Sequence, residues 1–220
     1  MTILAVTGLT REAKIAGVED VIAVTGGGDG PGLLQKLDAL HGDITGVISI
    51  GIAGALSPLR KVGDVVIADQ VFSRSEKWRC GEKWRVALTA RLPQAHIGPL
   101  FGSDAILADA AAKTALHDSS GALAVDMESH IAARFAAARA LPFAALRVIS
   151  DDAAHILPPA ALAAMKPDGG IAAGRVLLSL VKNPLQIPAL IRTARAANKA
   201  FAQLLRCRDL CGPGLAGLDL

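Results

Sequence analysis

Short apolar runs alternate with amphipathic, Ala-rich segments along most of this chain. Apolar runs bounded by Gly, Pro or polar residues are typical of buried strands; they occupy residues 3–6, 21–24, 46–50, 59–69 (a turn and then a strand), 97–101, 122–125 and 143–149. Helix-like segments cover 11–16, with Thr10 as N-cap, 33–40, 102–116 and 131–140. This alternation predicts an α/β domain with a mainly parallel sheet.

Two of the predicted strands lead directly into acidic residues. Asp126 and Glu128 follow the run 122–125, and Asp151 follows the run 143–149. Ligands of open α/β sheets bind in the crevice outside the carboxyl ends of the strands, so we expect Glu128 and Asp151 to face one crevice. Taken alone, Glu128 would better be explained as complementing a helix dipole, and Asp151 as a helix N-cap.

Glycines gather after the second and third predicted strands, in residues 25–32 and 51–56. The first segment contains neither the Gly-Lys-Ser/Thr of a P-loop nor the glycine spacing of a dinucleotide site. The first is either a flexible turn that uses positive φ angles or a backbone wall close to a ligand. The small residues of the second would let backbone amides approach a bound molecule.

The composition narrows the class of protein. Of 220 residues 52% are hydrophobic, 3% are aromatic and none is Tyr, which suits a buried sheet covered by Ala-rich helices. The net charge of +3 is dispersed, so we expect no nucleic-acid partner. The three cysteines form neither a disulfide framework nor a zinc pattern, and we expect no metal. No run reaches the roughly 20 apolar residues of a membrane span, no basic leader precedes the first strand, and we expect a cytoplasmic protein.

Two further segments leave alternatives open. The charged stretch 73–85 carries both tryptophans and is either a solvated loop or a pocket rim or subunit contact, since Trp and Arg favour interfaces. The tail, about 171–206, is apolar and then basic. It is either a packed helix pair or an amphipathic segment that touches a membrane surface or an apolar substrate.

Three segments, in order, carry a resemblance to a known family. They are Ser-Ile-Gly-Ile-Ala-Gly-Ala-Leu at 49–56 with Lys-Val-Gly-Asp at 61–64, Val-Asp-Met-Glu at 125–128, and Arg-Val-Ile-Ser-Asp at 147–151. They resemble the motifs of the purine nucleoside phosphorylase / methylthioadenosine nucleosidase superfamily over roughly residues 2–155. The resemblance implies a three-layer α/β/α sandwich with a twisted mixed central sheet, formed by one domain (1–220), and a homo-oligomer, dimeric or larger.

The tail adds a narrower resemblance. With Lys-Asn-Pro-Leu-Gln-Ile-Pro at 182–188, it is most similar to the hopanoid-biosynthesis-associated phosphorylases, which are thought to release adenine from adenosylhopane, a lipid nucleoside. The implied function is cleavage of the N-glycosidic bond of a 5′-modified adenosine. The alternatives are a nucleosidase of methylthioadenosine or S-adenosylhomocysteine and a non-catalytic nucleoside- or lipid-binding protein.

The resemblance also implies roles for the acids. Asp151 would be the general acid that protonates purine N7, oriented by Ser150, because the leaving base needs a proton. Glu128 would accept hydrogen bonds from the ribose 2′- and 3′-hydroxyls and stabilise the developing oxocarbenium ion. Met127 would pack against the ribose as a soft apolar surface.

The nucleophile remains open between water and phosphate. Glu12 stands near the residue that activates water in the nucleosidases, although a shift of one position would put Ala13 there. Arg11 stands near the residue that binds phosphate in some phosphorylases, and the backbone of Gly8 and Gly27 could add donors. No cofactor is implied, and phosphate would be a co-substrate only in the second case.

The base pocket departs from the nucleosidases. The Gly-Ser-Asp segment 102–104 is followed by Ile106 where they place an aromatic residue, so apolar contact would replace stacking. Leu107 would offer backbone groups to the edge of the base, and Ile52, Ala53 and Gly54 would complete the pocket. A preference for adenine is implied by the family alone.

Overall fold

The computed structural model describes residues 1–164, 166 and 168–217, which contain an eight-stranded mixed sheet. The strands are β1 (Thr2–Thr7), β2 (Val21–Thr25), β3 (Ile44–Ala55), β4 (Val65–Phe72), β5 (Lys77–Arg79), β6 (His96–Gly102), β7 (Ala124–Asp126) and β8 (Phe143–Asp151). The α-helices are α1 (Thr10–Ala16), α2 (Gly30–Asp38), α3 (Glu82–Arg91), α4 (Ala110–Ser120), α5 (Ser129–Ala138), α6 (Pro159–Leu162), α7 (Ala173–Lys182) and α8 (Ile187–Cys211). Two short 3-10 helices, η1 (Pro184–Gln186) and η2 (Pro213–Ala216), flank α8.

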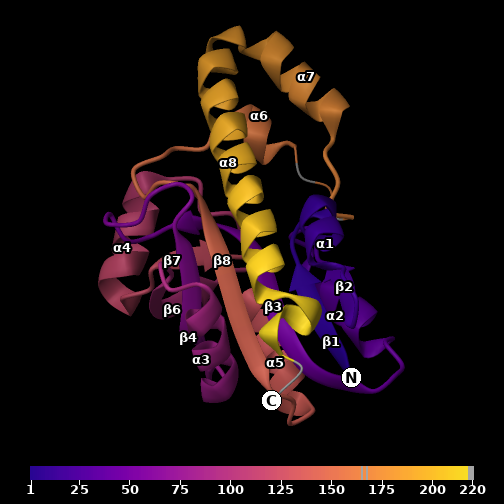
Figure 1. The fold of residues 1–220 in the computed structure, drawn as a ribbon. Helices are drawn as coiled ribbons and strands as arrows, with labels where there is room; N and C mark the ends of the chain where they lie inside the picture. Colours follow the sequence, from indigo (N-terminus) through magenta and orange to yellow (C-terminus); the bar gives the residue numbers. More distant parts are fainter. Residues whose placement is uncertain (165, 167, 218–220) are drawn as a thin grey trace.

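The sheet is largely parallel at one side and closes on itself at the other. β2, β1, β3 and β8 are successive parallel neighbours, and β8 then pairs antiparallel with β4. β7 pairs with both β3 and β6, and β6 pairs with β4. The strands β3, β8, β4, β6 and β7 therefore form a ring (Figure 1). β1, β2 and β5 lie outside it.

Alternation along the strands divides the core into two layers. One layer combines Val47 and Ala145 with apolar side chains of α2 and α5. The other combines Ile48 and Leu146 with side chains of α3 and α8. Successive strand residues point to opposite faces, so helices cover both sides of the sheet, as the predicted α/β architecture requires.

The predicted strands are all present, but several boundaries differ. β3 continues to Ala55, so the small residues 51–55 belong to a strand rather than to a loop. α2 already begins at Gly30, where the Asp29 carboxylate accepts a hydrogen bond from the Gly32 amide. α4 begins only at Ala110, capped by Asp109. At α1, Leu9 takes the N-cap position predicted for Thr10, because the Glu12 carboxylate satisfies the amides there.

The stretch 73–85 is not the solvated loop that its charges predict. It contains β5 and the start of α3, and Trp84 is fully buried. The indole Nε1 of Trp84 donates a 2.9 Å hydrogen bond to the Leu215 carbonyl, and its ring packs against Gly46 and Gly217. Trp84 thus ties α3 to the chain after α8 and belongs to the core.

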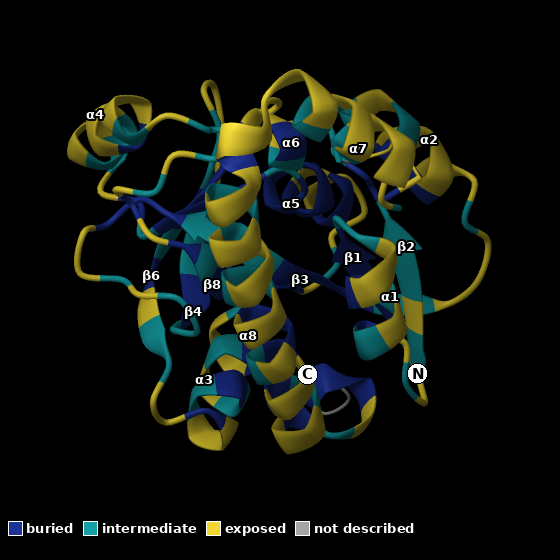
Figure 2. Ribbon diagram, turned by 90° about the horizontal axis from the view of Figure 1, so that it is seen from above, coloured by how far each residue is buried: buried dark blue, intermediate teal, exposed yellow. Residues whose placement is uncertain are grey.

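α7, η1 and the N-terminal half of α8 form an extension, called the arm below, that rises beyond the carboxyl ends of β1 and β8 (Figure 1). α7 has no buried residue, whereas the C-terminal half of α8 packs on the sheet through side chains such as Leu204 and Cys207. Figure 2 shows the contrast between the exposed arm and the buried strands. Within the described part of the chain, none of the helices combines the length and apolar character that crossing a bilayer would need.

The buried indole leads to a stability prediction. Trp84→Phe removes the hydrogen bond to Leu215 and part of the ring, so we expect the free energy of unfolding in urea to fall by about 1–3 kcal/mol. Trp78→Phe is the matched control, because Trp78 is only partly buried and should cost less than about 1 kcal/mol. Equal losses in the two variants would contradict the core role of Trp84.

Candidate active site

Glu12 is held at the start of α1 by backbone amides. Its Oε2 accepts 2.7 Å hydrogen bonds from the amides of Gly8 and Leu9, and its Oε1 accepts one of 2.7 Å from Ile52 on β3. A methyl group at Gly51 would lie 2.5 Å from Oε1, so glycine is needed there. Burial raises the pKa of Glu12, against the opposing effect of the Arg147 guanidinium and of these amides.

Glu128 lies on the other side of Gly8. A methyl group at Gly8 would stand 2.9 Å from Glu128 Oε2, and one at Gly26 would stand 3.0 Å from its Cγ. The Gly28 amide donates a 3.3 Å hydrogen bond to Oε1. Burial, together with the charge of Asp126, raises the pKa of Glu128 to about 8. The glycine-rich loop has the positive φ angles of the first predicted alternative, at Gly27 (66°) and Gly28 (73°), and its backbone lies against a buried carboxyl group of the protein itself.

Arg147 connects these acids from the middle of β8. It is buried, pairs in register with Gly51, and donates a 2.6 Å hydrogen bond from Nη2 to Ser49 Oγ. Its Nε lies 3.1 Å from Asp126 Oδ2. Burial would lower the pKa of Arg147, but Asp126, Glu12 and Glu128 together raise it. Within the described residues Nη1 has no hydrogen-bond partner, although buried donors normally have one.

Asp126 anchors the start of α5. Its Oδ1 accepts hydrogen bonds of 2.8 Å and 2.6 Å from the amides of Glu128 and Ser129. Burial alone would raise the pKa of Asp126, but the Arg147 guanidinium and these amides lower it. Asp126 is therefore the ionised partner of Arg147, and it fixes the backbone that carries Glu128.

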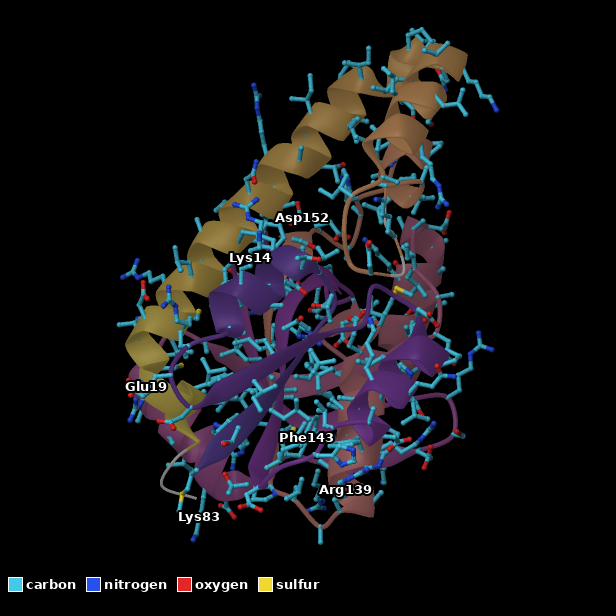
Figure 3. The ribbon with its side chains drawn as sticks, turned by 90° about the vertical axis from the view of Figure 1, so that its right-hand side faces the viewer. Lys14, Glu19, Lys83, Arg139, Phe143 and Asp152 are labelled. Carbon is cyan, nitrogen blue, oxygen red and sulfur yellow. The ribbon has the colours of Figure 1, made fainter. Side chains whose placement is uncertain are left out.

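Asp151 ends β8 in a separate polar cluster. Ser150 Oγ lies 3.0 Å from Asp151 Oδ1 and 3.1 Å from the Ala53 carbonyl oxygen, so its single proton is shared between two acceptors. Asp151 Oδ2 pairs with the ammonium group of Lys113, which comes from α4 and is fully buried. The labelled residues Phe143 and Asp152 mark the two ends of β8 in Figure 3, and the cluster lies at the Asp152 end, below the arm.

The remaining predicted substrate-binding residues differ in how far they are buried. Ala53 is buried, and Ile52, Gly54, Ile106, Leu107 and Met127 are partly buried. Gly54 lies against Asp151, because a methyl group there would be 3.1 Å from Oδ2. Leu107 packs with Phe101 and Val125 in a small hydrophobic cluster.

The predicted phosphate contacts are occupied by the protein itself. The guanidinium of Arg11 donates a 2.6 Å hydrogen bond to Asn198 and lies 4.2 Å from the centre of the Phe201 ring, so it is turned toward α8. The Gly8 amide bonds to Glu12, and the Gly27 amide bonds to the Gly8 carbonyl. The structure brings Glu12 and Glu128 together and does not bring Arg11 to them.

Three charged residues that lie beside these acids, Arg147, Asp126 and Lys113, are not among the candidate site residues that the sequence indicates. Arg147 and Asp126 stand inside the recognised motifs, and a charged residue in an otherwise apolar strand was an available signal for Arg147. Lys113 carried no such signal, because one lysine in an Ala-rich helix resembles a solvated residue. In the part of the chain that the structure describes, no group of three or more His, Cys, Asp or Glu side chains could hold a metal ion.

The structure is an α/β fold in which buried carboxyl groups from α1, β7 and the start of α5 surround the guanidinium of Arg147 in the middle of β8. Residues 6–182 match the family model described as the phosphorylase superfamily, and the chain belongs to that superfamily. A search of curated proteins finds no match.

Several solved structures share the fold at low sequence identity. A 5′-methylthioadenosine/S-adenosylhomocysteine nucleosidase from S. pneumoniae, with a transition-state inhibitor, is 20% identical with a TM-score of 0.62, over 93% of this chain and 100% of that one. The Helicobacter pylori enzyme, as a D198N mutant with 5′-methylthioadenosine, is 14% identical with a TM-score of 0.60, over 94% and 98%. The futalosine hydrolase of Helicobacter pylori is 14% identical with a TM-score of 0.59, over 94% and 97%.

The raised pKa of Glu128 leads to a prediction about stability and pH. Its pKa is about 8 in the folded chain against an ordinary value of 4.5. Between these values the folded state holds a proton that the unfolded state has released, so stability falls as pH rises, by at most about 1.4 kcal/mol per pH unit. Glu128→Gln removes this contribution.

The measured quantity is the free energy of unfolding of Glu128→Gln minus that of the wild type, obtained from urea unfolding at pH 5 and at pH 8. We expect this difference to be roughly 2–4 kcal/mol more positive at pH 8 than at pH 5. The exposed Glu82→Gln serves as control and should follow the wild type. Parallel pH profiles for wild type and Glu128→Gln would contradict the burial of an acid group at this position.

Proposed function

We propose that the protein cleaves the N-glycosidic bond of a 5′-modified adenosine and releases adenine with water as the nucleophile. The observation that carries the proposal is the convergence of Glu12 and Glu128 on opposite sides of Gly8, with Arg147 behind both. Membership of the phosphorylase superfamily and the nucleosidase fold support the same reaction class.

The sugar side of the reaction uses Glu128. A carboxyl group whose pKa is about 8 can both donate a hydrogen bond to one ribose hydroxyl and accept one from the other. As positive charge develops on the ribose, the opposite charge favours the ionised form of Glu128. Glu128 thus stabilises the oxocarbenium-like transition state more than the bound substrate, which is the condition for catalysis.

The base side uses Asp151 as the proton donor to N7. Its position as the last residue of β8 puts it at the edge where α/β enzymes bind ligands. Ser150 orients one carboxyl oxygen through its hydroxyl group. Ile106 and Leu107 would contact the purine ring from the segment before α4.

Water fits the nucleophile position better than phosphate. The amides of Gly8 and Gly27 are already bonded within the protein, and Arg11 is turned toward α8. Arg147 is already paired with the ionised Asp126, so its charge is not free for a phosphate dianion. Glu12 is fixed by three amides and would accept a proton from water, while the Nη1 of Arg147 offers a donor for that water.

The tail supports a lipid 5′-substituent, such as that of adenosylhopane, and a peripheral membrane contact. Leu177 and Val181 on α7 are 63% and 74% exposed, and Leu185 is also exposed. No acidic residue occurs between residues 169 and 208, while Arg175, Lys182, Arg192 and Arg195 do. An exposed apolar face beside basic residues is the pattern of helices that lie on anionic lipid surfaces.

The arm is linked to the proposed site. The amide of Thr10, the first residue of α1, donates a 3.0 Å hydrogen bond to the Gly169 carbonyl. Any side chain at Gly169 would collide with Thr25, next to the glycine-rich loop. The segment that leads into α7 therefore lies against Gly8 and Thr25, so a substrate chain leaving the ribose could follow the arm.

The first experiment measures base release. Purified protein is incubated with adenosine, methylthioadenosine, inosine and a long-chain 5′-alkyl adenosine, with and without phosphate, and free base and sugar are quantified by chromatography. We expect adenine and free sugar without phosphate, preferentially from the alkyl substrate. Asp151→Asn should fold and lose about 10²–10⁴-fold in turnover.

Each departure from that result has a meaning. A sugar 1-phosphate formed only with phosphate would establish phosphorolysis, and preference for methylthioadenosine would support a small-thioadenosine nucleosidase. Full turnover in Asp151→Asn would show that Asp151 is not the general acid that protonates the leaving base. No base from any substrate would favour a binding protein.

The membrane contact is tested by sedimentation with vesicles. We expect binding to phosphatidylcholine vesicles that contain phosphatidylglycerol, and weaker binding to phosphatidylcholine alone or in high salt. Leu177→Glu with Val181→Glu should weaken binding at least tenfold, roughly 1.4 kcal/mol or more. Leu59→Glu is the control, since Leu59 is 73% exposed and lies outside the arm. Equal binding of the arm variant and the Leu59→Glu control to the vesicles would contradict the proposal that the arm contacts the membrane.

A further inference from the structure

Lys113 is a buried cation without a part in the reaction described so far. It lies on α4, its side chain is fully buried, and its ammonium group pairs with Asp151 Oδ2. Its other hydrogen-bond acceptors are the carbonyl oxygens of Asp152 and His155, both at 3.2 Å. Burying an ammonium group is costly, and lysine is rarely found fully buried unless it is paired.

The pairing conflicts with the role proposed for Asp151. A general acid must hold a proton, whereas an adjacent ammonium group favours the carboxylate. The ammonium group of Lys113 nevertheless donates its hydrogen bond directly to Asp151 Oδ2, which is the contact along which a proton can reach Asp151. Asp151 can therefore serve as the general acid in this arrangement only if Lys113 takes part in the proton transfer.

The three partners of Lys113 suit both of its protonation states. An ammonium group donates three hydrogen bonds, which match the carboxylate and the two carbonyl oxygens. A neutral amine keeps two N–H donors for the carbonyl oxygens of Asp152 and His155 and presents its lone pair to a protonated Asp151. No polar group loses its partner when the proton moves, so the transfer does not leave an unsatisfied buried group.

We propose that Lys113 supplies the proton that Asp151 delivers to the leaving purine, an inference that rests on the proposed function. An N–H bond of Lys113 breaks and an O–H bond forms on Asp151. That proton then passes to purine N7 as the C1′–N9 bond breaks and its electron pair moves into the ring. Lys113 remains as a neutral amine. After the products leave, Glu12 releases to the solvent the proton that it took from the attacking water, and Lys113 takes up one proton from the solvent.

Lys113 would thus act through Asp151 as a positioning and proton-supplying residue. The contacts with the carbonyl groups of Asp152 and His155 hold its nitrogen at Asp151, while Ser150 holds the opposite carboxyl oxygen. A lysine that served only to attach α4 to the turn after β8 would make the same contacts. The two roles differ in whether the need for Lys113 depends on the leaving group.

The test compares leaving groups in Lys113→Met. One substrate is the adenine nucleoside that the wild type cleaves best, and the other is a 4-nitrophenyl riboside with the same 5′ group, whose phenolate leaves without a proton. We expect turnover of the adenine nucleoside to fall by about 10²-fold or more, with the 4-nitrophenyl riboside retained within about threefold. Methylamine should partly restore adenine release in Lys113→Ala.

Controls separate this inference from the proposed function. Lys36→Met removes an exposed lysine that also donates to a carbonyl group, that of Thr25, and should cleave both substrates like the wild type. If Lys113→Met does not fold, Lys113→Gln carries the same test, because its amide can keep both carbonyl contacts. Equal losses on both substrates, or none on either, would overturn the role of Lys113. Absence of wild-type cleavage would instead reject the proposed function.

Discussion

The ion pair between Arg147 and Asp126 is the constraint on which the site depends. Each group would be unstable if buried alone, and removing one partner of such a pair typically costs about 3–5 kcal/mol. Because Asp126 also binds the amides at the start of α5, the pair fixes the backbone of Glu128. The same guanidinium lies close enough to influence Glu12. One buried charge thus organises acidic residues from α1, β7 and the start of α5.

Glycine makes that arrangement sterically possible. Glu12 reaches the amide of Ile52 only because Gly51 has no side chain, and Glu128 approaches the loops of β1 and β2 only because Gly8 and Gly26 have none. These contacts exclude water from the carboxyl groups, and desolvation is the main cause of the raised pKa of each. The electrostatics of the site therefore arise from backbone packing rather than from an unusual choice of charged residues.

Sequence patterns predicted the strands well, since apolar runs and their carboxylate ends are local features. They predicted less where distant segments decide the outcome. Trp84 belongs to the core because a carbonyl group near the end of the chain receives its indole proton. β3 extends through small residues because β7 and β8 both pair with that part of it. The burial of Lys113 depends on acceptors that lie about 40 residues further along the chain. The residue pattern of α4 alone therefore does not predict it.

The ring of strands restricts how the sheet can meet another molecule. Among the described strands, β2 and β5 form the free borders, and β5 is a three-residue strand with charged ends at Lys77 and Arg79. A short, positively charged strand such as β5 discourages strand-by-strand growth between copies. The Lys36 ammonium group additionally binds the Thr25 carbonyl at the end of β2. A strand added at either described border would therefore meet a charged three-residue strand at β5 or, at the end of β2, a carbonyl group that is already bonded.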